Sequence, residues 1–130
     1  MADLTNEISE VSGDKISAIA IKTFFNIMDE WEVPAANQAN LLGLKEAESL
    51  DNFKISTPVT LTDEILKRIS YILGIYKGLG NLLPTRTQSN KWIKKPNVNF
   101  GSLSALDYMS QGEVFNLREV REYIDAQINN

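Results

Sequence analysis

Apolar residues recur at three- and four-residue intervals along most of this 130-residue chain, the spacing that places them on one side of an α-helix. The four prolines, at positions 34, 58, 84 and 96, interrupt this pattern. Each proline fixes its own φ and disfavours helical geometry at the preceding residue, so a helix has to end close to it. The sequence therefore predicts an all-α protein whose helices end near the prolines.

The first long helix is expected to begin at Asp14, which is a good N-cap residue, and to end before Pro34. We interpret residues 1–13 as a frayed arm or a short surface helix. The residues of the long helix that we expect to be buried share one helical stripe: Ile16, Ile19, Ala20, Phe24, Ile27, Met28 and Trp31.

Two short helical segments follow, at residues 34–42 and 45–53, with Gly43 between them. A short helix, a glycine-containing turn and a second short helix form the helix-turn-helix layout. Such a layout suggests DNA binding by the second helix. The candidate DNA contacts on that helix are polar or basic: Lys45, Ser49 and Lys54.

The charge of this region argues against DNA binding. The outward face of the second short helix carries Glu46, Glu48 and Asp51, which phosphates repel, and it offers no arginine for guanine. Residues 1–57 contain four lysines and ten acidic residues, whereas residues 58–130 contain nine basic and seven acidic residues. We therefore favour a packing role for the two short helices over a DNA-binding role.

The longest predicted helix covers residues 61–83, after a linker at residues 55–60, with Thr60 or Thr62 as its N-cap. Gly74 and Gly78 lie four residues apart on one side of it, and each costs about 1 kcal/mol in helix propensity relative to alanine. This cost predicts that a neighbouring backbone comes close to the two glycines. The residues expected to be buried are Ile65, Ile69, Ile72, Leu73, Tyr76, Leu79 and Leu83.

Residues 84–90 are polar and are expected to form a loop. A helix that carries Trp92 has to end before Pro96. Several bases surround this indole in the sequence, namely Arg86, Lys91, Lys94 and Lys95. They could contact phosphates beside a stacking platform, but we favour a basic rim around a half-buried tryptophan.

The segment after this helix is expected to form a compact loop, because Asn97 can bond its own backbone and Gly101 tolerates positive φ. A short helix follows. Ser102 or Ser104 is its predicted N-cap, and Gly112 is placed to end it.

The final helix is expected at residues 114–128. Its inward residues are predicted to be Phe115 or Leu117, with Val120, Ile124 and Ile128. Its outward residues are charged: Glu113, Arg118, Glu119, Arg121, Glu122 and Asp125. Arg118 and Glu122 are four residues apart, as are Arg121 and Asp125, and this spacing favours surface ion pairs.

Cysteine and histidine are both absent. The chain therefore lacks the usual nucleophile pairs and the commonest metal ligands, and we expect no metal and no cofactor. The paired acids Asp63–Glu64 and Glu119/Glu122 are typical of solvated helix surfaces, so we do not expect an enzyme. The acidic N-terminus lacks a signal-peptide pattern and no apolar run approaches the ~20 residues of a membrane span, which favours a cytoplasmic protein without membrane contact.

Residues 92–112 read WIKKPNVNFGSLSALDYMSQG. This string resembles the C-terminal toxin-binding domain of the Xre/MbcA/ParS antitoxins. The matching positions are Trp92, Pro96, Asn97, Phe100, Gly101, Leu106, Asp107, Met109 and Gly112. Ala105 stands where the family usually has proline, which changes the preference at the first position of a short helix. Residues 31–54 resemble the Xre-like helix-turn-helix that precedes this domain.

The resemblance implies two modules: an N-terminal arm with a helix-turn-helix at residues 1–57, and a toxin-binding domain at residues 58–130. It implies an antitoxin of a type II system that sterically neutralises a RES-type, NAD-consuming toxin, in a homo-oligomer or a hetero-complex with the toxin. Autorepression through DNA is a second implied role, and a DNA-binding regulator that neutralises no toxin is the alternative.

In this family the last helix and the last residues obstruct the active-site cleft of the toxin. The corresponding residues here are Arg118, Arg121, Glu122, Asp125, Gln127, Asn129 and Asn130. Charge reversal at Arg121, or deletion of residues 126–130, is therefore expected to weaken neutralisation without unfolding the chain.

Overall fold

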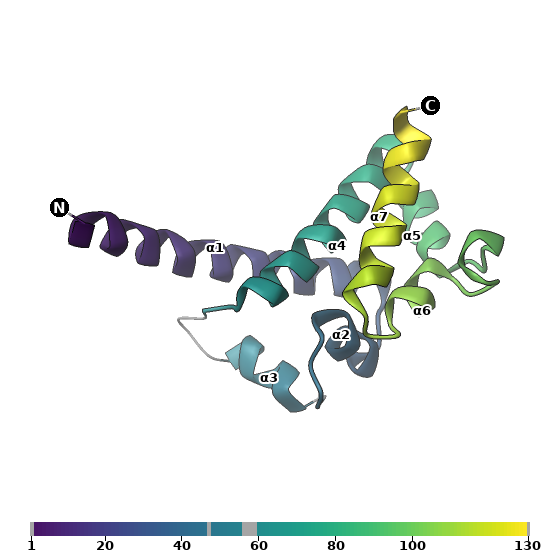
Figure 1. The fold of residues 1–130 in the computed structure, drawn as a ribbon. Coiled ribbons are helices and arrows are strands. Elements are labelled where there is room, and N and C mark those ends of the chain that lie inside the picture. Colours follow the sequence, from purple (N-terminus) through teal and green to yellow (C-terminus); the bar gives the residue numbers. More distant parts are fainter. Residues whose placement is uncertain (1, 47, 56–59, 130) are drawn as a thin grey trace.

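The computed structural model describes residues 2–46, 48–55 and 60–129 of the chain. Its helices, shown in Figure 1, are α1 Ala2–Trp31, α2 Ala35–Leu42, α3 Glu48–Ile55, α4 Asp63–Leu82, α5 Arg86–Lys94, the 3-10 helix η1 Val98–Phe100, α6 Ala105–Met109 and α7 Val114–Asn129. The described residues contain no β-strand, apart from one isolated bridge between Pro96 and Ser104. The predicted all-α class is confirmed. The inner part of the predicted linker, residues 56–59, lies outside the described residues.

The first helix is longer than predicted. α1 is one helix of 30 residues that passes through Asp14, so the prediction of an N-cap there is wrong. No proline interrupts residues 2–31, and the backbone can continue its helical hydrogen bonds through the predicted arm. The helix ends at Trp31 as predicted, where Glu32 has a φ of 56° and Val33 donates its N–H to the carbonyl oxygen of Met28. The N-terminal half of α1 extends away from the other helices (Figure 1).

The second half of α1 contributes to the core. Phe24 and Trp31 are buried as predicted, whereas Ile16 and Ile19 are 55% and 67% exposed, which contradicts the prediction for these two. Ser17 lies between them and is buried, and its hydroxyl accepts a hydrogen bond from the N–H of Leu61 over 3.1 Å. Ile16 and Ile19 point away from the face that this contact defines, so helical spacing alone placed the stripe incorrectly at its N-terminal end.

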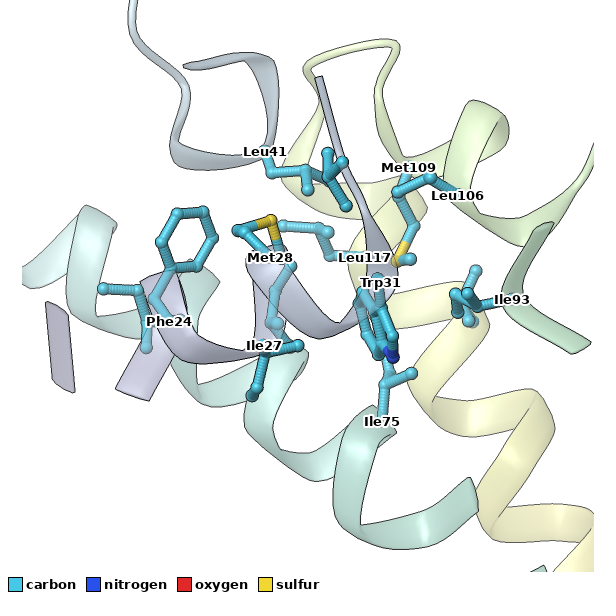
Figure 2. Packing of buried hydrophobic residues seen from close by; sticks show 14 of the residues in the cluster. Phe24, Ile27, Met28, Trp31, Leu41, Ile75, Ile93, Leu106, Met109 and Leu117 are labelled. Carbon is cyan, nitrogen blue, oxygen red and sulfur yellow. The ribbon is translucent and has the colours of Figure 1, made fainter. Parts of the chain in front are cut away.

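α4 lies at the centre of the fold and packs most extensively against α7 and then against α1 (Figure 1). Because it is covered on two sides, its buried surface is wider than the predicted seam. Ile69, Ile72 and Leu79 are buried as predicted, and Ile75, which was not predicted, is also fully buried. Figure 2 shows the side chain of Ile75 beside Trp31 in the core. One hydrophobic cluster thus includes residues from both predicted modules, and the division at residue 57 stays a prediction.

A buried arginine of α4 contacts the C-terminal end of α2. α2 ends at Gly43, with a φ of 74°, as predicted, while α3 begins at Glu48, three residues later than expected. Arg68 of α4 is only 6% exposed, and its Nη1 donates to the carbonyl oxygens of Asn40 and Leu41, each over 3.4 Å. These carbonyls belong to the last turn of α2, where the regular helical hydrogen bonds end, and that of Asn40 also accepts from the N–H of Gly43 over 3.0 Å. The guanidinium therefore caps the C-terminus of α2.

The polar segment before Trp92 is a helix, so the prediction of a loop at residues 84–90 is wrong from Arg86 onward. Thr85 and Gln88 form a capping box, in which the N–H of Gln88 donates to Thr85 Oγ1 and the N–H of Thr85 donates to Gln88 Oε1, each over 3.2 Å. This reciprocal pair satisfies the first N–H groups of α5 and outweighs the low apolar content of the segment. α5 ends at Lys94, which confirms the predicted stop before Pro96.

The loop after α5 follows the prediction closely. Asn97 Oδ1 accepts a hydrogen bond from the N–H of Asn99 over 2.9 Å, and Gly101 has a φ of 65°. Of the two predicted caps for the next helix, Ser104 is the one used, because its hydroxyl accepts from the N–H of Asp107 over 3.0 Å. α6 ends at Met109, three residues before the predicted stop at Gly112.

Candidate protein-binding surface

α7 is held on the body of the protein by one apolar face. Leu117, Val120 and Ile124 are fully buried, so Leu117 rather than Phe115 is the inward residue of the two predicted alternatives. Phe115 is 49% exposed. Ile128 faces α4 as predicted, with its Cδ1 3.5 Å from a Cβ placed on Gly78, although 40% of it is exposed. The last described turn of α7, residues 126–129, is exposed.

The opposite face of α7 is a row of exposed side chains, which we call the α7 ridge: Phe115, Arg118, Glu122, Asp125 and Asn129. Both predicted ion pairs are present, Arg118 Nε to Glu122 Oε1 at 3.8 Å and Arg121 Nε to Asp125 Oδ2 at 3.1 Å. Such exposed pairs contribute little to stability. The ridge is therefore free to exchange these contacts for contacts with a partner.

Phe115 was not among the predicted binding residues. The guanidinium carbon of Arg118 lies 5.3 Å from the centroid of its ring, so the two side chains form one continuous surface. The sequence does contain a pattern from which this could have been predicted. Phe115, Arg118 and Glu122 are spaced i, i+3 and i+7, which puts them on the same side of a helix.

The remaining predicted binding residues lie elsewhere on α7. Arg121 lies over α4 rather than on the ridge, because Gly74 leaves room for its guanidinium there. Gln127 is exposed in the last turn, and Asn130 lies outside the described residues. The structure thus brings together Arg118, Glu122, Asp125 and Asn129 of the predicted set.

Four aromatic rings surround the loop after α5: Trp92, Phe100, Tyr108 and Tyr123. Trp92 stacks on Tyr123 with ring centroids 6.2 Å apart, and Phe100, which is buried, lies 5.3 Å from Tyr108. The hydroxyl of Tyr108 donates to Glu119 of α7, and this bond raises the pKa of Tyr108. The rings therefore connect the loop to α7. The ring of Tyr123 covers one face of the Trp92 indole, and a nucleic-acid base cannot stack on that face.

The motif residues that led to the family resemblance are structural. Phe100, Leu106 and Met109 belong to the hydrophobic core, while Asn97 and Gly101 shape the loop between them. Ala105 occupies the first position of α6, where a proline would also fit, so the departure from the family pattern leaves the helix intact.

The bases near Trp92 border a groove of about 430 Å³ between the end of α1 and α5. Its lining mixes both signs of charge: Glu30, Glu32, Thr87, Asn90, Lys91, Lys94 and Lys95. Lys94 Nζ pairs with Glu32 at 3.3 Å, and Arg86 stacks on Tyr76 with its Cζ 3.8 Å from the ring centroid. The structure thus favours the predicted basic rim over a phosphate-binding platform.

The predicted DNA contacts lie on and before α3. Lys45 is exposed and Ser49 is half-buried, while the ammonium of Lys54 lies 5.1 Å from the ring centroid of Phe25 on α1. Glu46 and Asp51 are exposed as expected, and the side chain of Glu48 lies outside the described residues. DNA binding by this region stays a prediction.

The structure brings no obvious catalytic or metal-binding group together in the part of the chain that it describes. No group of three or more His, Cys, Asp or Glu residues there is arranged to hold a metal ion. Among the paired acids, Glu64 pairs with Arg68 at 3.2 Å and Glu119 accepts from Tyr108. Within the same described ranges, every helix is too short or too polar to cross a membrane.

Comparison with known proteins places these features in a family. Residues 79–127 match the model of the antitoxin Xre/MbcA/ParS C-terminal toxin-binding domain, a span that includes α5, the loop, α6 and most of α7. The chain is also 37% identical over 107 residues to the uncharacterised protein y4oB of Sinorhizobium fredii, and the aligned part covers 82% of each chain. No solved structure matches the chain significantly.

Proposed function

This chain belongs to the Xre/MbcA/ParS antitoxins, and from that membership we propose that it neutralises its toxin sterically, by placing α7 and the residues after it over the toxin's active site. The observation that carries the proposal is the state of α7. One face of the helix is fixed by three fully buried side chains, while the α7 ridge is exposed: Arg118 pairs with Glu122 and lies by the ring of Phe115, and Asp125 accepts from Arg121.

A rigid helix is suited to this task. Binding is weakened by the entropy lost when mobile side chains and loops are ordered, and a docked helix has already lost most of that entropy. Aromatic and arginine side chains are the usual anchors of protein interfaces, and the ridge offers Phe115 and Arg118 side by side. The glutamate and aspartate of the ridge, Glu122 and Asp125, then suit a partner surface with a basic rim.

The partner that we propose is a RES-type toxin that consumes NAD, acting in the cytoplasm. This part of the proposal depends on the family resemblance of the motif at residues 92–112. A chain without histidine or cysteine has no obvious means of inactivating an enzyme chemically, so occlusion of the active site is the simplest mode of action.

The test combines the toxin encoded beside this chain with variants of the α7 ridge. We expect deletion of residues 126–130, and the charge reversals Arg118→Glu and Glu122→Lys, to weaken toxin binding in calorimetric titration. For a central anchor the loss is about 2–4 kcal/mol, or roughly 30- to 1,000-fold in Kd. Growth of cells that express the toxin reports neutralisation independently.

Lys22→Glu is the matched control, because Lys22 is an exposed base on α1, an element that does not pack on α7 as α4 does. It should bind toxin like the wild type. Helical circular dichroism and the unfolding midpoint verify that each variant is folded. Wild-type affinity in the deletion variant and in both charge reversals would place the interface away from α7.

A second role, repression of its own operon, is favoured by the arrangement of α2, the turn at Gly43 and α3. A gel-shift titration on the upstream DNA at several salt concentrations tests it, since phosphate contacts weaken steeply as salt rises. Retardation that disappears with salt would support autorepression. No retardation at low salt would leave toxin binding as the sole role.

A further inference from the structure

Two glycines of α4 accept two side chains of α7. A Cβ placed on Gly74 would overlap the guanidinium of Arg121, with Nε only 2.7 Å away, and a Cβ on Gly78 would lie 2.7 Å from Cγ2 of Ile124. The two helices run side by side in the same direction, so residues four apart on α4 meet residues three apart on α7 (Figure 1). The sequence predicted a neighbouring backbone at these glycines, but the approaching groups are side chains.

The guanidinium of Arg121 has a defined partner in this position. Its Nε donates to both carboxylate oxygens of Asp125, over 3.1 Å and 3.4 Å. About a third of the Arg121 side chain is exposed, at 35%, compared with 49% for Arg118 on the ridge. Arg121 thus lies between the backbone of α4 and a carboxylate one turn closer to the C-terminus.

Gly74 is necessary for this arrangement, because any larger residue would occupy the space of the guanidinium. A glycine inside a helix costs about 1 kcal/mol relative to alanine, so the position carries a local penalty that the contact with α7 has to offset. Gly74 thus leaves the space in which the guanidinium of Arg121 reaches Asp125.

We propose that Arg121 is a positioning residue for toxin binding: seated over Gly74, it holds Asp125 and the last turn of α7 in the orientation that the toxin requires, and it does not itself contact the toxin. This inference rests on the proposed function of α7. It differs from the simpler view, in which the charge of Arg121 meets the toxin directly.

Gly74→Ala separates the two views, because it displaces the guanidinium while keeping its charge. The guanidinium is the far end of a flexible side chain, so it can swing into solvent when a Cβ enters its seat. A positioning role predicts that toxin affinity falls about three- to thirtyfold, the range seen for residues that act without touching a ligand. A direct contact predicts wild-type or tighter binding, since the charge becomes more accessible.

Gly80→Ala is the matched control. It makes the same change in the same helix, and its Cβ would also overlap an arginine, but that arginine is Arg86 of α5. Both variants gain the same helix propensity, so a difference in toxin affinity between them reports the displacement of the Arg121 guanidinium. We expect toxin affinity within about twofold of wild type for Gly80→Ala, because the displaced guanidinium is that of Arg86 on α5 and not that of Arg121 on α7.

A double-mutant cycle completes the test. Arg121→Ala should weaken binding by a similar factor, and Gly74→Ala combined with Arg121→Ala should bind like Arg121→Ala alone, because no guanidinium remains to be displaced. The proposal would be overturned if the double variant lost affinity by the product of the two single losses. It would also be overturned if Gly74→Ala bound the toxin as tightly as wild type. The thermal unfolding midpoint of every variant is measured, and affinities are compared at temperatures below all of these midpoints.

If Gly74→Ala does not fold, Arg121→Lys decides the question. Lysine keeps the charge but has no Nε–H in a planar group to lie across Gly74 and reach both oxygens of Asp125. A positioning role predicts a loss like that of Arg121→Ala, whereas a direct charge contact predicts near wild-type binding. Failure of the wild-type chain to bind the toxin would refute the proposed function itself. That outcome differs from the results that the positioning role and the direct charge contact predict for the variants.

Discussion

The hydroxyl of Tyr76 donates a hydrogen bond to Glu30 Oε2 over 2.6 Å and joins the second half of α4 to the last turn of α1. The other carboxylate oxygen of Glu30 accepts from Nδ2 of Asn90 on α5 over 3.3 Å. Arg86 covers the Tyr76 ring and donates from Nη1 to the Tyr76 carbonyl oxygen over 2.9 Å. One carboxylate of α1 therefore connects this helix with both α4 and α5.

Tyr76→Phe should lower the free energy of unfolding by about 1 kcal/mol. The change removes a hydrogen bond to a charged group, and the partial exposure of both side chains reduces its effect. The ring and its stacking with Arg86 remain. Urea denaturation followed by circular dichroism measures the loss, and Tyr71→Phe on the same helix serves as a hydroxyl-deletion control. Equal stability of Tyr76→Phe and wild type would mean that water replaces the bond without cost.

The same bond predicts how stability depends on pH. The hydrogen bond to Glu30 raises the pKa of Tyr76, with burial as a second cause, whereas an unfolded tyrosine titrates near its ordinary value of about 10. The folded state holds this proton more tightly, so its contribution is complete below pH about 10 and is lost as pH rises through the higher folded pKa.

Unfolding free energies of wild type and Tyr76→Phe, measured from pH 8 to about pH 11, test this dependence. The difference between them should be constant below pH about 10 and shrink above it, and the subtraction removes the titration of lysines common to both proteins. A difference that grows with pH would have the wrong sign. Tyr108→Phe should show the same trend, because the bond to Glu119 also raises the pKa of Tyr108.

Arg68→Met should destabilise the protein by about 2 kcal/mol, because it leaves the carbonyl oxygens of Asn40 and Leu41 without their charged donor in a buried site. Hydrogen exchange should accelerate most in α2. Lys67→Met is the control: the adjacent side chain is exposed, and its replacement should change stability by less than about 0.5 kcal/mol. Unchanged exchange in α2 would show that the cap is not needed to hold that helix.

Thr85→Ala should cost about 1 kcal/mol, the usual effect of removing an N-cap side chain. Thr87→Ala, two residues along in the first turn of the same helix and also exposed, is the matched control and should be neutral or slightly stabilising. Thermal unfolding of the two variants side by side measures the contrast. Equal midpoints would indicate that tertiary packing of α5, rather than its capping box, keeps the segment helical.

Local features of the sequence determined most of the helices. Proline at 34 and 96 ended α1 and α5, Thr62 and Ser104 provided caps, and Gly43 ended α2, because each acts through neighbouring backbone groups alone. The exception among local features is the Thr85 capping box. This capping box is also a local feature, but the polarity of residues 84–90 led to the prediction of a loop there.

Tertiary structure decided which faces these helices bury. Spacing placed Ile16 and Ile19 in the core, but the side of α1 that is covered is the one that carries Ser17. Spacing left out Ile75 because it assumed a single covered side of α4. The pattern at residues 92–112 was sufficient to indicate the family, since its residues build one local loop and its packing. The position of the Arg121 guanidinium over Gly74 could not be predicted in the same way. It depends on how α7 packs on α4, and the two residues are nearly fifty positions apart in the sequence.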